Sequence, residues 1–277
     1  MIIELLQSLV LGITGGFSEW LPIGSDAHFL LVGDLLGARQ NAALFSLTTA
    51  LISIGSAVAV ISLYTGRLLP FLFRSGPAKE RAGRKLWFKL LLASIPAIIP
   101  ALIKPRLAFL GSPYLTGVMV ILTGLLLLYA DRHGNPSWLE IDKVSRITPK
   151  TAFLIGCGQL LTLLPGTSRT TCVIAAALLL GCSRRTAAEF AFFLGVPMIF
   201  FGALRHIFYF IRHGEGFGLI TLPGILLGGI AAYFAAVYSI RFLQSRLKDG
   251  DYTFFVLYRA VLGIVILSYF IIYALMR

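Results

Sequence analysis

The sequence predicts an all-α integral membrane protein that combines six full membrane spans with two re-entrant helical hairpins. Three observations lead to this prediction. First, 57% of the 277 residues are hydrophobic and only 13% are charged, with a mean hydropathy of +0.87, so the chain has too little polar surface for a water-soluble globule. Second, several uncharged runs are long enough to cross a bilayer. Third, two further apolar stretches are interrupted by Pro, Gly and charged or hydroxyl residues.

The predicted full spans alternate with polar loops. A crossing needs roughly 17 to 25 mostly apolar residues, and four runs approach or exceed that length, residues 44–64, 111–130, 216–240 and 260–276. Residues 87–103 and 187–204 complete the six. The first apolar stretch follows the acidic Glu4 rather than a basic segment, so we expect it to be retained and not cleaved as a signal peptide.

Basic residues are concentrated in the loops between these spans. The formal net charge is +12, and residues 67–85 contain one acid, Glu80, against six basic residues, Arg67, Arg74, Lys79, Arg81, Arg84 and Lys85. Because cytoplasmic loops of membrane proteins carry an excess of Lys and Arg, we place residues 67–85, 131–150 and 241–251 in the cytoplasm. The same distribution argues against nucleic acid as a partner, since the positive charge is not gathered on one soluble face.

The two interrupted stretches are residues 1–38 and 151–181. Non-helical backbone at membrane depth is tolerated only where protein buries it or where it lines a wet cavity, which favours re-entrant hairpins. An internal repeat relates them: with an offset of 143, five identical residues coincide, Leu11 with Leu154, Gly15 with Gly158, Leu21 with Leu164, Pro22 with Pro165 and Ser25 with Ser168. We therefore predict a single membrane domain, 1–277, with a first repeat, 1–130, and an inverted second repeat, 151–277, whose hairpins enter from opposite faces and meet near the midplane.

The interruption of the first stretch gathers groups that can do chemistry. Two carboxylates, a hydroxyl and an imidazole lie within ten residues of embedded sequence: Glu19, Ser25, Asp26 and His28. Charged side chains inside a membrane are costly, and they usually mark a functional site. The alternative is an interfacial loop, in which both carboxylates face water and the imidazole caps or packs.

The interruption of the second stretch has the composition of an anion cradle. It combines a glycine, consecutive hydroxyls and one fixed cation in Gly166, Thr167, Ser168, Arg169 and Thr170. Backbone N–H groups and hydroxyls at a helix start suit phosphate, and an arginine fork grips two phosphate oxygens at once. The same residues would also make an ordinary N-capped turn.

The two interruptions together favour phosphoryl chemistry. Ser25 is the candidate nucleophile, His28 the candidate general acid or base, and Arg169 the group that stabilises charge on the transferring phosphoryl group. Three other embedded charges are explained by helix dipoles, snorkelling or pairing: Asp34, Glu189 and Arg259. Three further histidines lie in polar loops without metal-ligand spacing and receive no function: His133, His206 and His213.

At these interruptions the sequence resembles the bacterial undecaprenyl pyrophosphate phosphatase family, also known for bacitracin resistance. The family motifs are close to EGxTEFLPVSSTGH and PGxSRS, and here they read GGFSEWLPIGSDAH and PGTSRT. The likeness continues in order through Gly181 to Phe190 and Val196 to Met198, and reaches Tyr258 and Arg259 near the end. It implies a multi-pass enzyme of the bacterial cell membrane that removes the terminal phosphate of a polyprenyl pyrophosphate at the outer face, often as a homodimer and with a divalent cation, Mg or Ca.

Matched to the family pattern, Glu19, Ser25, His28, Gly166, Ser168 and Arg169 occupy motif positions. The sequence departs from the pattern at Gly15, where the family has its first Glu, at Gly24, where it has a Ser, and at Asp26. Farther along, Ser46 and Ala50 stand where the family has a Glu and a Gln. We expect Asp26 to restore the lost charge and to form, with Glu19, the two-carboxylate site for the cation.

The resemblance implies hydrolysis of undecaprenyl pyrophosphate to the monophosphate carrier lipid, which serves the synthesis of peptidoglycan and other envelope polymers. The main alternative is a non-hydrolytic carrier or flippase for a lipid phosphate, which would use the same inverted repeat for alternating access. The missing side chains at Gly15 and Gly24 favour that alternative, while Ser25, His28 and Arg169 favour the enzyme. A channel or scaffold fits less well, since neither needs hydroxyls facing an acidic cluster.

Overall fold

The computed structural model describes residues 2–38, 41–72, 76–103, 111–134, 141–214, 222–248 and 250–276. Within these ranges the regular structure is helical, apart from a bridge that pairs Ile141 with Cys182. The prediction of an all-α membrane protein is therefore confirmed.

Within the described residues, five helices are long and apolar enough to cross a bilayer, and each coincides with most of one predicted span; residues 216–221 of the predicted span 216–240 lie outside the described residues. The five helices are α3 (Ala42–Leu63), α7 (Pro113–His133), α10 (Arg184–His213), α11 (Leu222–Arg246) and α12 (Thr253–Leu275). Their exposed residues are largely Leu, Ile, Val and Phe, as expected for surfaces that face lipid rather than water.

The sixth predicted span, residues 87–103, is not one continuous helix. It consists of the last turns of α5 (Pro77–Ser94), a 3₁₀ turn, η3 (Ile95–Ala97), and α6 (Ile98–Ile103). Pro96 lies inside the turn, and a proline removes a helical hydrogen bond and clashes with the preceding turn. Shorter pieces follow α3 and precede α8: α4 (Thr65–Leu68), η2 (Pro70–Leu72) and η6 (Val144–Arg146).

Both interrupted stretches form helical pairs with a sharp break between them. The first pair is α1 (Ile2–Trp20) and α2 (Ser25–Leu35), and the second is α8 (Pro149–Cys157), continued by the 3₁₀ segment η7 (Gly158–Leu163), with α9 (Arg169–Leu179). Each break contains a proline followed by a glycine in the left-handed conformation. Gly24, with φ 92°, lies two residues after Pro22, and Gly166, with φ 79°, lies one residue after Pro165. Glycine adopts this backbone conformation without the steric cost that a Cβ would bring.

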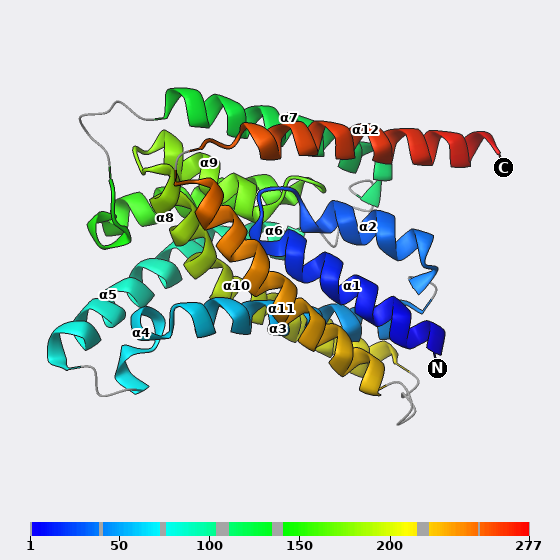
Figure 1. Ribbon diagram of the computed structural model, residues 1–277, viewed down its shortest axis with the longest axis horizontal. Coiled ribbons are helices and arrows are strands. Elements are labelled where there is room, and N and C mark those ends of the chain that lie inside the picture. Colours follow the sequence, from blue (N-terminus) through cyan, green and yellow to red (C-terminus); the bar gives the residue numbers. More distant parts are fainter. Residues whose placement is uncertain are drawn as a thin grey trace.

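The helical pairs approach each other from opposite ends of the molecule (Figure 1). Both chain termini and the open end of α1 and α2 lie on the right, whereas α4, the start of α5 and the start of α8 lie on the left. The long helices pack in pairs around the breaks: α1 with α11, α11 with α3, α3 with α10, α7 with α12 and α5 with α8. Close packing needs small residues, since a Cβ at Gly16 of α1 would overlap the backbone of Ala232 in α11.

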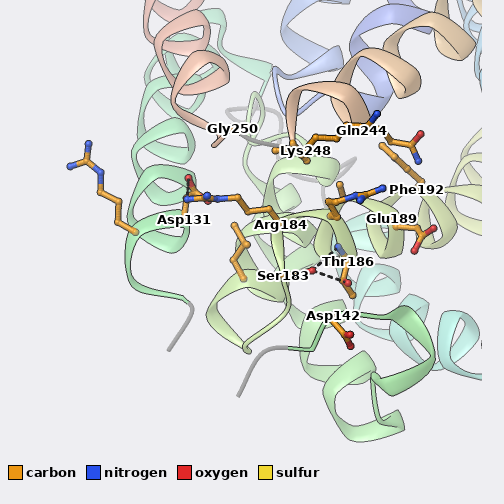
Figure 2. A pocket seen from close by; sticks show the side chains of 15 residues that line it. Asp131, Asp142, Ser183, Arg184, Thr186, Glu189, Phe192, Gln244, Lys248 and Gly250 are labelled. Carbon is orange, nitrogen blue, oxygen red and sulfur yellow. Dashed lines mark hydrogen bonds and ion pairs between the residues drawn. The ribbon is translucent and has the colours of Figure 1, made fainter. Parts of the chain in front are cut away.

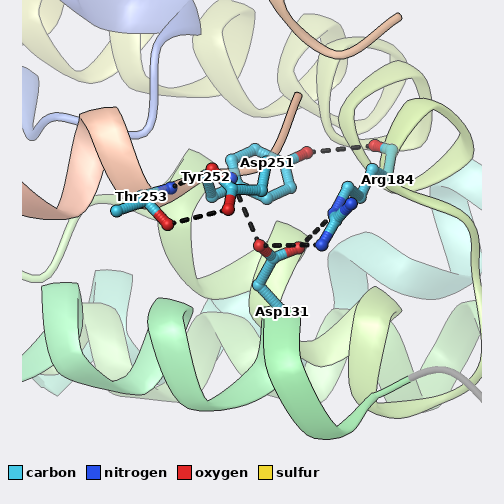
Figure 3. Close-up of polar contacts among 5 residues, drawn as sticks. All are labelled: Asp131, Arg184, Asp251, Tyr252 and Thr253. Atoms are coloured by element: carbon cyan, nitrogen blue, oxygen red, sulfur yellow. Dashed lines mark hydrogen bonds and ion pairs between the residues drawn. The ribbon is translucent and has the colours of Figure 1, made fainter. Parts of the chain in front are cut away.

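A polar network ties together the end of α7 and the starts of α10 and α12 (Figure 3). The Asp131 carboxylate, at the end of α7, accepts from Arg184 Nε at 2.6 Å and from the backbone N–H of Tyr252 at 3.2 Å. The Tyr252 hydroxyl donates to the backbone carbonyl of Arg184 at 3.0 Å. Burial, helped by the nearby Asp131 carboxylate, raises the pKa of Tyr252 well above its ordinary value, so this hydroxyl stays a donor.

Candidate functional site

The breaks of the two helical pairs are in direct contact. Arg169, the first residue of α9, donates from Nη2 to the Glu19 carboxylate at 2.9 Å, and the Thr170 hydroxyl donates to the backbone carbonyl of Glu19 at 2.8 Å. Arg169 Nη1 also donates to the carbonyl of Gly195 in α10 at 3.2 Å, and its guanidinium lies 5.8 Å from the Trp20 ring centre. Arg169, the cation of the second break, is therefore fixed against the first break.

A pocket of about 260 Å³ lies where the breaks meet. Its charged and polar lining comes from both breaks and from the long helices around them: Glu19, Ser25, Asp26, Thr49, Ser53, Gln159, Thr162, Ser168, Arg169, Arg205 and His206. Its apolar lining includes Phe29, Ala97, Ala101, Met198 and Phe201. The pocket thus joins a charged end to an apolar wall, which matches a ligand with a polar head and an apolar tail.

Two helices begin at this pocket. Ser25 and Asp26 open α2, and Ser168 and Arg169 cap and open α9. A helix N-terminus carries unsatisfied N–H groups and a partial positive charge, and it therefore attracts anions. Two such ends together with Arg169 make the pocket suitable for a phosphate or diphosphate group.

The candidate nucleophile has an acceptor beside it. The Ser25 side chain lies beside the Glu19 carboxylate, which is paired with Arg169. The Asp26 carboxylate is within electrostatic range of Glu19, Arg169 and His206. Five residues predicted from sequence therefore gather at the pocket: Glu19, Ser25, Asp26, Ser168 and Arg169.

The other predicted site residues are not among those that line the pocket. The His28 ring lies parallel to Tyr258, with ring centres 5.7 Å apart, and contacts Tyr258 and the carbonyl of Gly24. The Thr167 hydroxyl donates to the carbonyl of Leu164 at 2.8 Å, and the carbonyl of Gly166 accepts from Arg259. These residues, like Thr170, hold the breaks in shape.

Sequence reasoning missed several residues that line the pocket. Arg205 and His206 belong to α10 and not to a loop, and the His206 ring is 2.8 Å from the Ser46 hydroxyl through Nδ1. Thr49 and Ser53 lie on the same face of α3 as Ser46, at spacings of three and seven residues. That helical spacing was visible in the sequence, and it is the signal that could have found them.

The space beside Gly15 explains the departure at that position. A Cβ at Gly15 would lie 2.6 Å from the Phe29 ring carbon Cζ and 2.7 Å from Ile52 Cγ2. The Phe29 ring therefore fills the volume that a glutamate at position 15 would need, and Phe29 itself lines the pocket. The second carboxylate of the pocket is Asp26.

The pocket offers oxygen atoms that could bind a hard cation, but the described residues do not form a complete metal site. Within the described residues there is no cluster of three His, Cys, Asp or Glu side chains that could hold a metal. Glu19 and Asp26 line the same pocket, and so does Gln159, whose buried amide oxygen Oε1 has no hydrogen-bond partner in the described part of the chain. Carboxylate and amide oxygens are the ligands that Mg and Ca prefer.

A larger cavity, about 900 Å³, lies between the end of α7, the start of α10 and the end of α11, and it is lined by none of the predicted site residues (Figure 2). Its three carboxylates are all paired: Asp131 with Arg184, Asp142 with Arg146 and Glu189 with Arg67. Ser183 caps α10 there through Thr186. These ion pairs and the helix cap account for the polar lining of the cavity.

Known proteins resemble this chain over nearly its whole length. Residues 8–265 match the family model described as bacitracin resistance protein BacA. An undecaprenyl-diphosphatase of Desulfitobacterium hafniense is 34% identical over 272 residues, covering 97% of each chain. Similar proteins of the same name occur in Streptococcus thermophilus, 34% identical over 97% of this chain and 94% of the relative, and in Streptococcus equi, 35% identical over 97% of both.

Proposed function

The chain belongs to the bacitracin resistance protein BacA family, and from that premise we propose that it hydrolyses undecaprenyl diphosphate to undecaprenyl phosphate and phosphate. The chain is a multi-pass membrane enzyme, and the lipid product is the carrier used in envelope polymer synthesis. The observation that carries the proposal at the level of residues is the contact between Arg169 and Glu19, which joins the two breaks at one pocket.

The diphosphate binds, in this proposal, where α2 and α9 begin. Arg169 and the N–H groups of the two helix starts hold its oxygens. The isoprenoid chain follows the apolar wall made by Phe29, Ala97, Ala101 and Phe201 toward the bilayer. Binding the head by charge and the tail by burial suits a lipid that never leaves the membrane.

Ser25 attacks the terminal phosphorus. As its oxygen bonds to phosphorus, its proton passes to Glu19, the carboxylate beside it. The bond between that phosphorus and the bridging oxygen breaks, and undecaprenyl phosphate leaves with the electron pair. A water molecule then attacks the phosphoserine, so that phosphate is released and the Ser25 hydroxyl is restored. Arg169 stabilises the charge that develops on the phosphoryl oxygens.

A divalent cation, Mg or Ca, completes the proposed site. Glu19, Asp26 and the unpartnered Oε1 of Gln159 are the residues that would hold it, together with oxygens of the diphosphate. When bound, the cation neutralises part of the negative charge on the substrate. Chelation with EDTA should abolish phosphate release, and added Mg or Ca should restore it.

The site faces the outside of the bacterial inner membrane in this proposal. The pocket is lined by Arg205 and His206 near the end of α10, while the basic loops lie at the start of that helix. Since loops rich in Lys and Arg stay in the cytoplasm, the pocket lies toward the opposite, outer side. Association into a homodimer is a further expectation, which crosslinking in membranes would test.

The decisive experiment is an assay of phosphate release from undecaprenyl diphosphate by the purified protein with Mg or Ca. Ser25→Ala and Arg169→Ala should each lower kcat by about 100-fold or more, since the first removes the nucleophile and the second removes a charge-stabilising donor, a loss that costs that much in other enzymes. Ser145→Ala and Arg146→Ala, exposed at the other end, serve as matched controls. Wild-type protein that binds the lipid but releases no phosphate would contradict the proposal.

A further inference from the structure

Two consecutive residues of α12, Tyr258 and Arg259, reach the two breaks. Tyr258 acts through His28. The His28 Nδ1 is 2.7 Å from the carbonyl of Gly24, and its Nε2 is 2.7 Å from the Tyr258 hydroxyl. A carbonyl only accepts, so Nδ1 carries the proton; a neutral ring then accepts at Nε2 from the tyrosine O–H. Both ring nitrogens are engaged, and neither is offered to the pocket.

Arg259 reaches the second break directly. Its side chain is 0% exposed, and it donates from Nε to the carbonyl of Val120 at 3.0 Å, from Nη1 to the Thr171 hydroxyl at 3.1 Å, and from Nη2 to the carbonyl of Gly166 at 3.0 Å. Nη2 also contacts the Thr123 hydroxyl. None of the ion pairs among the described residues involves Arg259. Burying a cation is costly. Arg259 donates only to neutral oxygens here, and we interpret its role as fixing the positions of those oxygens.

The two carbonyls held in this way lie close to matched positions of the repeat, one residue out of register, because Gly24 aligns with Thr167 and not with Gly166. Gly24 directly precedes Ser25, and Gly166 precedes Ser168 and Arg169 by two and three residues. Both glycines have the left-handed conformation, with φ 92° and 79°. A Cβ on Gly24 would lie only 3.3 Å from Arg259 Nη1. Arg259 therefore contacts Gly166 directly, and Tyr258 is linked to Gly24 through His28.

We propose that Tyr258 and Arg259 are positioning residues that set the two breaks against each other, and that His28 links Tyr258 to Gly24 instead of exchanging a proton with the substrate. The inference rests on the proposed function, because the groups positioned are Ser25 on one break and Arg169 on the other. A displacement of about 1 Å between reacting groups can cost about 100-fold in rate. The arrangement therefore sets kcat without touching the substrate.

Conservative variants separate this role from catalysis. The amide N–H of an asparagine occupies the place of the histidine Nδ1–H, so His28→Asn keeps the bond to Gly24 and loses the one to Tyr258. We expect Tyr258→Phe and His28→Asn to lower kcat by about threefold, and His28→Ala and Arg259→Lys by about 10-fold, each with little change in KM. Tyr269→Phe is the matched control, because its hydroxyl, on the same helix, bonds to Asp34 at 3.0 Å away from the breaks.

A spectroscopic measurement tests the inference without depending on enzyme activity. The chain has four histidines, so the ¹⁵N spectrum of histidine-labelled protein can be assigned with the His28→Asn variant. We expect the His28 signals of an Nδ1–H ring, with the Nε2 signal shifted in Tyr258→Phe. Three results would each overturn the inference. His28→Asn could be as inactive as His28→Ala, the His28 ring could carry its proton on Nε2, or folded Arg259→Lys could have the kcat of wild type. Wild-type protein without phosphatase activity but with the expected ¹⁵N signals would sink the proposed function and leave the contacts standing.

Discussion

Phe29 occupies the volume that a side chain at position 15 would need, and this single ring changes how the missing carboxylate is understood. A glutamate at position 15 would not simply refill a vacant place, because the closest contacts are a ring carbon and a buried isoleucine. We expect Gly15→Glu to destabilise the protein by about 2 kcal/mol, as overpacking of a filled core does. Thermal unfolding in detergent would measure it. Gly15→Glu combined with Phe29→Ala should recover most of the loss, and no recovery would contradict the steric explanation.

Arg205 and His206 place two nitrogen-bearing side chains on the pocket from α10. We expect Arg205→Ala to raise KM for undecaprenyl diphosphate about fivefold, because loss of roughly 1 kcal/mol of phosphate binding weakens affinity by that factor. Ser46→Ala should give a smaller rise, since it only removes the partner of the His206 ring. The kinetic constants of both variants would be compared with those of His213→Ala, whose ring stacks on Tyr209 at the end of the helix. A KM equal to wild type in Arg205→Ala would show that this end of the pocket does not bind the head group.

Local sequence was sufficient for the residues at the breaks and insufficient for those on long helices. Glu19, Ser25 and Arg169 were found because charge or hydroxyl beside Pro and Gly in apolar sequence is costly and rare. His206 was assigned to a loop, since the helix that carries it continues to His213 beyond the apolar run. His28 has the right residue type, yet its ring turns toward α12. Which way a helical side chain faces depends on how helices pack, and one sequence does not contain that information.

At the scale of elements, apolar length predicted five crossings and failed to show that the sixth is broken. Residues 87–103 have the composition of a span, but Pro96 divides them into α5, η3 and α6. The break has a consequence, because Ala97 and Ala101 then line the pocket. The prediction weighed hydropathy and gave too little weight to a proline at the centre of the run.

Asp131 holds three helix ends, and its removal tests how much that junction stabilises the fold. Its side chain is 2% exposed, and it accepts from Arg184 and from the backbone of Tyr252. We expect Asp131→Ala to lower the free energy of unfolding by about 2 kcal/mol, since it leaves a buried N–H and a cation without their acceptor. Asp142→Ala is the control, because the Asp142 and Arg146 side chains are 46% and 64% exposed and such pairs contribute little. Equal melting temperatures for both variants would contradict this account.

Over the whole molecule, the contacts between helices have a two-fold pattern. If each helix of the first half is exchanged with its counterpart in the second half, the same pairs of helices remain in contact. If α1 and α2 correspond to α8 and α9, then α3 corresponds to α10, α5 with α6 to α11, and α7 to α12. The contacts pair α3 with α10 and α7 with α12. They also pair α1 with α11, and the counterparts of these two helices, α8 and α5, are paired in the same way. The predicted division into residues 1–130 and 151–277 stays a prediction, but an exchange of this kind would bring the two breaks together.

The ends of the molecule can be told apart by labelling, which tests the orientation on which outward access to the pocket depends. Ala42 is exposed at the start of α3, near the chain termini, and Ser145 is exposed in the basic loop before α8. On intact cells, a membrane-impermeant maleimide should label Ala42→Cys and not Ser145→Cys, because excess Lys and Arg keeps the second loop in the cytoplasm. Cys157 is partly exposed and is replaced by alanine in both variants; Cys172 is buried, and burial raises the pKa of Cys182 to about 12, so hardly any of it is thiolate. Labelling of Ser145→Cys alone would place the pocket on the cytoplasmic side, where a diphosphatase would act on newly made lipid and not on lipid released outside.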